Sequence, residues 1–268
     1  MVFSVRNKVI SAIGAGLLAV SSAGYLVPAA DAGPFTWDGG GSNNNFNTCL
    51  NWDSSALACA GIPAPLPGAG DRIIFGGSTR TTPNNNLTGF STQSITFTSS
   101  AAAFTVNGNP ISITKSDGIT NNSSATQTLN TELKTLVDQT WKTSSTGGLQ
   151  INGAVVLGSS DLTLDIGTGS SSNVTGVVSG SGRIEKSGGG KLTLAGNNTY
   201  DGGTSITGGT VKISKNANLG DSAGALSLDG GTLQNSVDVS MARVTGLKTG
   251  GGGFQTDSGT TLTHAGLI

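Results

Sequence analysis

Apolar and polar residues alternate in short runs along most of the chain, and Gly or Asn separates one run from the next. Residues 192–194 read Leu-Thr-Leu, and residues 211–213 read Val-Lys-Ile. A period of two is typical of a β-strand with one buried face. Gly and Asn supply the positive φ angles that tight turns need. The pattern therefore predicts many short β-strands joined by tight turns.

Gly-Gly pairs between these runs recur at a fixed interval. Gly208, Gly230 and Gly252 each begin such a pair, and the two intervals between them are equal. A period in the twenties indicates a solenoid. A leucine-rich repeat has a similar period, but here more strand and Gly-Gly occur where its helical half should be. We therefore predict an all-β fold, a right-handed parallel β-helix whose coils stack about 4.8 Å apart.

We expect this β-helix to cover residues 71–268. Its clearest strand patterns lie at residues 72–75, 94–97, 104–106, 111–113, 149–151, 154–157 and 162–166. Residues 128–142 are the least strand-like, since part of this segment also fits one or two helical turns. We prefer the strand interpretation, with Leu129, Leu133 and Val137 facing the core. The last run, residues 254–268, is interpreted as the front of a truncated coil.

The N-terminus has the pattern of an export signal. Two basic residues precede an apolar run over residues 9–27, and Ala-Asp-Ala ends at Ala32. This pattern predicts a signal peptide over residues 1–32, removed between Ala32 and Gly33. An uncleaved membrane anchor is the alternative, because the run is long enough to span a bilayer. The Gly, Ser and Pro content of the run and its Ala-x-Ala ending favour cleavage.

Residues 33–70 differ in composition from the rest of the chain. They hold two of the three tryptophans and both cysteines. A solenoid needs an end cap, because its first coil would otherwise expose the core and an unpaired strand edge. We therefore expect residues 33–70 to form an irregular N-terminal cap and linker. If the chain is exported, Cys49 and Cys59 are expected to pair as a disulfide; two free thiols are the alternative.

Composition excludes several function classes. The 268 residues include 43 Gly, 11% are charged, 5% are aromatic, and the net charge is −1. Such a chain favours a thin, elongated core. Without a basic cluster, nucleic acid is not an expected partner. One His and two Cys provide no metal-ligand set, and the Gly run at residues 188–190 lacks the ending of a phosphate-binding loop. We expect no cofactor and no metal.

Two acidic residues are the best candidates for catalysis. Asp161 and Asp165 flank a Leu-Thr-Leu run and would share one strand face. Two carboxylates on one face could flank a glycosidic bond, and an enzyme would need them to converge with groups such as Lys186 and Lys191. Solvated outward positions are the alternative interpretation, and we prefer it.

A second candidate lies near the C-terminus. Asp257-Ser258-Gly259 resembles the nucleophile region of serine proteases, and His264 is the one histidine of the chain. A triad needs a base held by a third group, and in the chymotrypsin-like order the histidine precedes the serine. We interpret the run as a turn and assign no catalytic residue.

One block resembles a known family. Residues 190–211 read Gly-x-Leu-Thr-Leu-x-Gly-x-Asn-Thr-Tyr-x-Gly-Gly-Thr-x-Ile, followed by Gly-Gly-Thr-Val. This run resembles the autotransporter-associated β-strand repeat, also called the passenger-associated transport repeat. The preceding Val-Ser-Gly-Ser-Gly and Lys-Ser-Gly-Gly-Gly resemble its usual lead-in. The resemblance covers residues 178–213 well.

The resemblance implies an exported fragment of an autotransporter-like passenger, located at the cell surface or outer membrane or secreted. It would be a non-catalytic β-helical stalk for surface presentation or adhesion, with a host or surface polysaccharide or protein as partner. An outer-membrane β-barrel translocator is expected in a full-length form, and its strand pattern is absent from these residues. The alternatives are a β-helical polysaccharide lyase or hydrolase and a free-standing secreted binding module.

Overall fold

The computed structural model describes residues 19–20, 26–27, 33–53, 59, 66–144 and 146–268. The chain divides into two compact units, residues 1–33 and residues 34–268. In the first unit, β1 (Ala19–Val20) pairs with β2 (Leu26–Val27) in the antiparallel sense. Most of the expected signal peptide, including Ala32 at the cleavage site, lies outside the described residues. Within the described part of the chain, no helix has the length and apolar character to cross a membrane.

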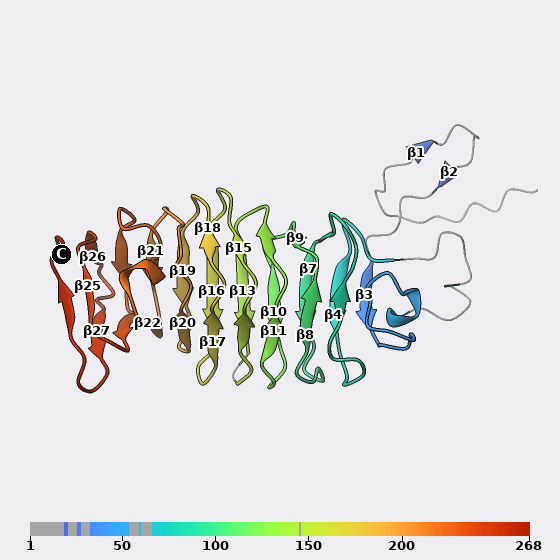
Figure 1. Ribbon diagram of the computed structural model, residues 1–268, viewed down its shortest axis with the longest axis horizontal. Helices are drawn as coiled ribbons and strands as arrows, with labels where there is room; N and C mark the ends of the chain where they lie inside the picture. Colours follow the sequence, from blue (N-terminus) through green and yellow to red (C-terminus); the bar gives the residue numbers. More distant parts are fainter. Residues whose placement is uncertain (1–18, 21–25, 28–32, 54–58, 60–65, 145) are drawn as a thin grey trace, which may run out of the picture. The chain divides into compact units, whose positions relative to one another are not determined.

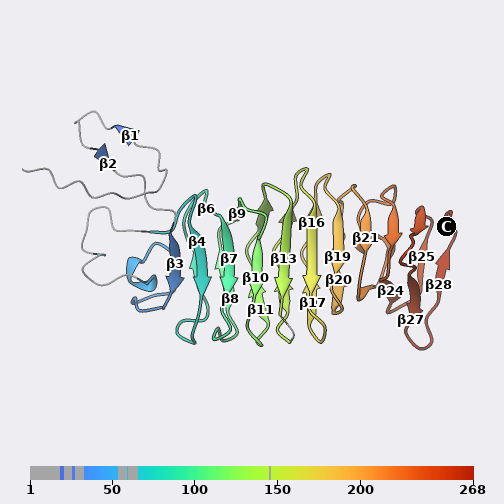
Figure 2. The same ribbon diagram turned by 180° about the vertical axis from the view of Figure 1, so that it is seen from behind.

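The second unit is a parallel β-solenoid, in which strands from successive coils lie side by side in sequence order (Figures 1 and 2). The first sheet has ten strands. In chain order they are β3 (Pro34–Trp37), β4 (Arg72–Phe75), β7 (Ser94–Phe97), β10 (Ile119–Asn121), β13 (Gln139–Thr143), β16 (Leu162–Ile166), β19 (Ile184–Ser187), β21 (Thr204–Ile206), β23 (Leu226–Leu228) and β26 (Thr245–Leu247).

The second sheet has nine strands. They are β5 (Asn84–Asn85), β8 (Thr105–Gly108), β11 (Gln127–Leu129), β14 (Leu149–Ile151), β17 (Ser171–Val174), β20 (Lys191–Leu194), β22 (Thr210–Ile213), β24 (Thr232–Asn235) and β27 (Gly253–Thr256). The described residues thus form the predicted all-β solenoid.

The third sheet is interrupted. It has five strands, β6 (Ser91–Thr92), β9 (Ile111–Ile113), β12 (Leu133–Thr135), β15 (Val155–Val156) and β18 (Val178–Ser179). In the next part of the chain, the short 3₁₀ helix η2 (Asn216–Leu219) stands between strands of the other sheets. Two strands, β25 (Val239–Met241) and β28 (Leu262–His264), then pair in a separate small sheet.

Each coil keeps its strands in register while its turns vary in length. Thr210 pairs with Thr232, which reproduces the interval of the Gly-Gly pairs, but Thr232 pairs with Gly253, one position short of that interval. The step from Ile184 to its partner Thr204 is shorter still. The interval is therefore approximate, because turns can gain or lose residues without disturbing the parallel ladder.

Alternate side chains fill the interior. In β16, Leu162, Leu164 and Ile166 are buried, whereas Thr163 and Asp165 between them are partly exposed. Burial of one large aliphatic side chain stabilises the fold by about 1.5–3 kcal/mol, so this repeated alternation supplies most of the stabilisation of a thin core.

The first strand of the solenoid lies within the segment that we expect to form the cap and linker. β3 pairs in parallel with β4, with Phe35 opposite Ile73 and Trp37 opposite Phe75. After β3 the chain turns back, so that Trp52 forms an antiparallel bridge with Trp37. The segment between these two residues contains a second short 3₁₀ helix, η1 (Cys49–Asn51). Residues 34–52 therefore supply both the first strand of the solenoid and side chains that cover its end.

Aromatic side chains close this N-terminal end. Trp37, Phe46 and Trp52 are fully buried, and the rings of Trp37 and Trp52 meet edge to face at 5.0 Å. The Trp52 Nε1–H donates to the Phe46 carbonyl oxygen at 2.8 Å, so the indole is buried with its polar atom satisfied. Cys49 and Cys59 are joined as a disulfide, with a sequence separation of 10 residues.

Residues 128–142 adopt the strand interpretation, as β11, β12 and β13. Leu129 and Leu133 are buried, as predicted. Val137 is 40% exposed, and the prediction that it faces the core is wrong. It lies in the bend between β12 and β13, where the chain changes direction and the strand alternation no longer applies.

Candidate functional site

The two candidate acidic residues lie on or beside the first sheet, but each is engaged in its own surface contact. Asp161 Oδ2 lies 2.9 Å from Arg183 Nη2, and Asp161 Oδ1 accepts a hydrogen bond from the Arg183 backbone N–H. Asp165 Oδ2 lies 3.7 Å from Lys142 Nζ. Both ion pairs lie at the surface, where such pairs contribute little to stability.

Lys186 points into the solenoid and is fully buried. Its Nζ donates to three backbone carbonyl oxygens, those of Ser187 at 2.5 Å, Gly188 at 2.8 Å and Gly208 at 3.2 Å. Burial lowers the pKa of Lys186 to about 8, and the negative charge of Asp165 opposes this shift. The ammonium therefore joins two glycine turns in successive coils, and it does not face a surface groove.

Lys191 completes the set of four residues that an enzyme would have to bring together. It lies on β20 of the second sheet, whereas Asp161, Asp165 and Lys186 belong to the first sheet or its turns. The four side chains do not converge on one groove. The structure therefore removes the specific arrangement on which the polysaccharide-enzyme hypothesis depended.

The Asp257-Ser258-Gly259 run forms a turn in which Thr260 bonds back to the Asp257 carbonyl. The Asp257 carboxylate accepts from Lys212 Nζ at 2.6 Å and from Gln234 Nε2 at 2.5 Å. The Lys212 hydrogen bond holds the pKa of Asp257 below its usual range. His264 Nε2 lies 2.7 Å from the Thr245 hydroxyl. These contacts do not form a Ser–His–Asp arrangement.

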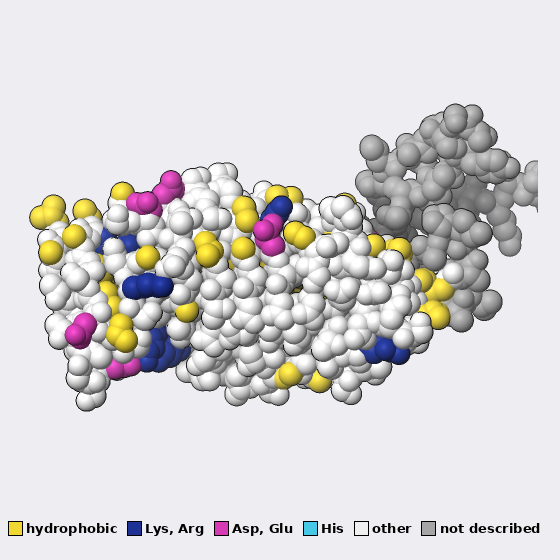
Figure 3. Space-filling model, in the orientation of Figure 1, with side chains coloured by type: hydrophobic (Ala, Val, Ile, Leu, Met, Phe, Trp, Pro, Cys, Tyr) yellow, Lys and Arg dark blue, Asp and Glu magenta, His cyan; other side chains and the backbone are white. Residues whose placement is uncertain are grey.

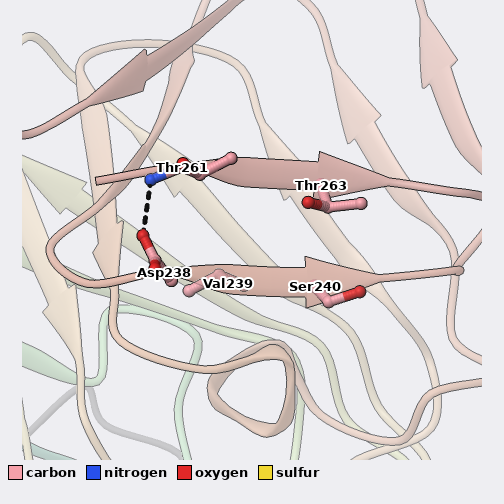
Figure 4. A pocket seen from close by; sticks show the side chains of 5 residues that line it. All are labelled: Asp238, Val239, Ser240, Thr261 and Thr263. Atoms are coloured by element: carbon pink, nitrogen blue, oxygen red, sulfur yellow. Dashed lines mark hydrogen bonds between the residues drawn. The ribbon is translucent and has the colours of Figure 1, made fainter. Parts of the chain in front are cut away.

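An open cavity of about 390 Å³ lies over β25 and β28. Figure 4 shows its lining residues, and the Asp238 carboxylate accepts a hydrogen bond from the Thr261 backbone N–H at 2.7 Å. Ser240 and Thr263 are opposite each other in the ladder and exposed. Hydroxyl groups and one carboxylate can hydrogen-bond a polar molecule, but they provide no nucleophile with an adjacent base.

No metal centre is present among the described residues: no group of three or more His, Cys, Asp or Glu is close enough together to hold an ion. The space-filling view shows Lys and Arg gathered over the C-terminal coils, and a mostly uncharged surface in the middle of the visible face (Figure 3).

Arg243 was not singled out by the sequence analysis, although it has the most hydrogen-bonded side chain of the described interior. Its guanidinium donates to Asn216 Oδ1 and to the carbonyl oxygens of Asn216, Leu219, Gly220, Asp221 and Gly224. A usable signal was the alternation of Val239, Met241 and Arg243, which places all three inward. The same alternation from Ile184 places Lys186 inward.

Arg243 also lies in the electrostatic environment of buried Tyr200. Burial raises the pKa of Tyr200. Two smaller effects oppose this rise: the hydrogen bond of its hydroxyl with Thr204, and the positive charge of Arg243. The Tyr200 and Thr204 oxygens are 2.7 Å apart. Tyr200 and Arg243 therefore fill the interior where the third sheet is interrupted.

Comparison with known proteins identifies the central block. Residues 184–213 match the family model for the passenger-associated-transport-repeat, which confirms the assignment of this repeat. The matched segment contains β19, β20, β21 and β22. It therefore includes the buried Lys186 and Tyr200.

The chain is also similar to the adhesin BmaC autotransporter of Brucella suis biovar 1 (strain 1330). The two are 36% identical over 95 residues, which is 35% of this chain and 3% of that protein. The chain thus matches only a small part of that relative's length. No solved structure matches the chain. The repeat match and the similarity to an autotransporter both agree with the expectation of export to the cell surface or outer membrane.

Proposed function

We propose that this chain is an exported part of an autotransporter-like passenger and acts as a non-catalytic β-solenoid stalk for surface presentation or adhesion. The observation that carries this proposal is the ladder of the first sheet, which continues through ten parallel strands and passes through the transport repeat. In a full-length form, we expect an outer-membrane translocator to accompany such a passenger.

A stacked ladder suits this role physically. Each coil contacts mainly its neighbours, so the fold can grow coil by coil. A chain that folds in this way outside the membrane can draw the rest of itself outward, because each folded coil templates the next. The similarity to an adhesin autotransporter supports a role in contact with other surfaces.

The positions of the ionisable side chains support a non-catalytic role. Asp161 and Asp257 are engaged in surface contacts with Arg183 and Lys212. Lys186 and Arg243 are engaged by backbone carbonyls in the interior. None of these groups is left with the acid–base pairing that polysaccharide hydrolysis needs.

An antibody raised against residues 34–268 tests the proposal on fractionated cells. We expect the antigen in the outer membrane or medium, and we expect protease added to intact cells to degrade the membrane-bound form. Antigen that stays protected inside intact cells would refute export. Purified protein that depolymerises a panel of polysaccharides would refute the non-catalytic assignment.

A further inference from the structure

A chain of side-chain hydrogen bonds crosses the outer face of the second sheet from coil to coil. Asn130 Nδ2 donates to Asn107 Oδ1 at 2.8 Å, and Asn152 Nδ2 donates to Asn130 Oδ1 at 2.9 Å. The Thr175 hydroxyl continues the row by donating to Asn152 Oδ1 at 2.8 Å. We call these four residues the amide ladder. It spans the coils of β8, β11, β14 and β17.

Two further amides lie beside this row and extend the hydrogen-bonded surface. Gln150 Nε2 donates to Asn152 Oδ1 at 2.7 Å, and Asn173 Nδ2 donates to Gln150 Oε1 at 3.0 Å. Each contact fixes a side chain that would otherwise rotate freely. A preorganised surface loses less conformational entropy when it binds a ligand.

The ladder keeps unused hydrogen-bonding capacity. A side-chain amide has two N–H donors and two acceptor lone pairs. Asn130 uses one N–H group and one acceptor site within the ladder, so one of each remains. Asn152 keeps one N–H group, because its Oδ1 accepts from both Gln150 and Thr175. Both residues are exposed, and they lie at the interval of neighbouring strands, about 4.7–4.9 Å.

The outward positions of these four strands carry no charge. They are Thr105, Asn107, Thr128, Gln150, Ser171 and Asn173. Along the same sheet, the first outward lysines are Lys191 on β20 and Lys212 on β22. The charges of Glu132 and Lys134, which follow Asn130 in the chain, pair with each other at 3.2 Å. A charged polymer therefore finds no unpaired opposite charge on the four strands and would lose hydration there. This neutrality favours a neutral partner.

The strand arrangement also disfavours an extended peptide. A peptide that adds to a sheet pairs with a free strand edge. Here β11 is paired with β8 and β14, and β14 is paired with β11 and β17. Only the side chains of these strands are available to a ligand on this face, so a partner there would be recognised through side-chain hydrogen bonds.

We propose that the amide ladder binds a neutral, linear polysaccharide that lies along the solenoid axis, with its hydroxyl groups meeting the outward amides. Each sugar hydroxyl both donates and accepts a hydrogen bond, which matches the mixed donors and acceptors of the row. The proposal rests on the surface-exposed, adhesin-like role proposed above, and it names the partner of that role.

Binding of hexasaccharides to the full chain tests this proposal. The neutral probes are cellohexaose, mannohexaose and maltohexaose, and the charged probes are a galacturonic acid hexamer and a heparin hexasaccharide. We expect at least one neutral probe to bind, and we expect the charged probes to bind with lower affinity. The double variant Asn130→Ala/Asn152→Ala should bind the neutral probe with an affinity at least tenfold lower.

The matched control is Thr140→Ala/Thr163→Ala, since these residues are opposite each other on the outer face of the first sheet. This variant should bind like the parent chain. Thermal melting checks that both variants fold; if the ladder variant melts early, the near-isosteric Asn152→Asp takes its place. It adds a carboxylate to the ladder and should also weaken neutral binding.

Three results would overturn the inference: binding of charged probes only, binding of no probe, or equal losses in the ladder and control variants. A change of oligomeric state in the ladder variant without a change in sugar binding would assign the face to a second copy instead. Surface exposure measured on intact cells is independent of these results, so failure of the ladder proposal and failure of the stalk proposal can be told apart.

Discussion

Arg243 holds Asn216 by two hydrogen bonds, from Nε to the side-chain oxygen at 2.9 Å and from Nη2 to the backbone oxygen at 3.1 Å. Asn216 begins η2, the helix that stands where the third sheet is interrupted. The same guanidinium donates to the Gly224 carbonyl oxygen at 2.7 Å. One buried cation thus replaces the hydrogen bonds that a strand would have supplied to this part of the coil.

We expect Arg243→Met to lower the free energy of unfolding by more than about 2 kcal/mol, because several buried carbonyl oxygens would lose their donor. Urea denaturation of the purified chain measures this change. The control is Arg183→Met, which breaks the exposed pair with Asp161 and should cost at most about 1 kcal/mol. Equal losses in the two variants would contradict the structural role of Arg243.

Lys186 should make stability depend on pH. Its pKa is about 8 in the folded chain, below the ordinary value of 10.5, so the folded state releases its proton first. Stability contributed by Lys186 is therefore lowest below about pH 8 and rises as the pH approaches 10.5. At about 1.4 kcal/mol per pKa unit, the gain between pH 8 and 10.5 is on the order of 3 kcal/mol.

Lys186→Met isolates this effect. We expect the difference in unfolding free energy between the parent chain and the variant to change along this pH range, with the parent gaining relative to the variant. Other groups titrate equally in both chains and cancel in the difference. Parallel profiles across the range between the folded and ordinary pKa values would show that burial does not shift the pKa of Lys186.

Gly209 tests close packing within the transport repeat. Its φ is 62°, and an added Cβ would overlap the Gly190 carbonyl oxygen and lie 2.9 Å from Lys186 Nζ. Gly259 has a similar φ of 76°, with nothing within 4 Å of such a Cβ. Gly259→Ala should therefore cost about 1–2 kcal/mol from backbone strain alone.

Gly209→Ala carries the same strain together with a collision against backbone. We expect it to destabilise the chain by at least about 1 kcal/mol more than Gly259→Ala, and thermal or urea unfolding of both variants measures the difference. If the two variants were equally stable, the turns around Lys186 would have to be looser than the structure shows.

The Cys49–Cys59 disulfide is expected in the exported protein. Peptide mass spectrometry without reduction should recover the two cysteines in one linked species. Replacing both by Ser should cost about 2–3 kcal/mol, the chain-entropy value for a loop of this length. Rapid alkylation of both thiols in the native, unreduced protein would show instead that they are free.

Much of the fold was predictable because its signals are local. The Leu-Thr-Leu alternation at residues 192–194 and the Gly-Gly turns depend only on side-chain direction and backbone angles, and they led to the solenoid. The strand interpretation of residues 128–142 succeeded for the same reason. The prediction for Val137 was wrong because the alternation of apolar and polar residues does not show where a strand ends in a bend.

What the sequence by itself determined is the class of fold, the transport repeat and the expectation of export. Tertiary structure alone decided at which strand the first sheet begins and which polar groups pair. β3 pairs with β4, and its first residue Pro34 lies opposite Arg72. This step is much longer than the interval of the Gly-Gly pairs, so no fixed interval revealed it. Strand alternation points Lys186 and Arg243 inward, but it does not tell which carbonyl oxygens accept their hydrogen bonds. Partners such as Gly208 and Gly224 are distant in the sequence, and only the stacking of coils brings them together.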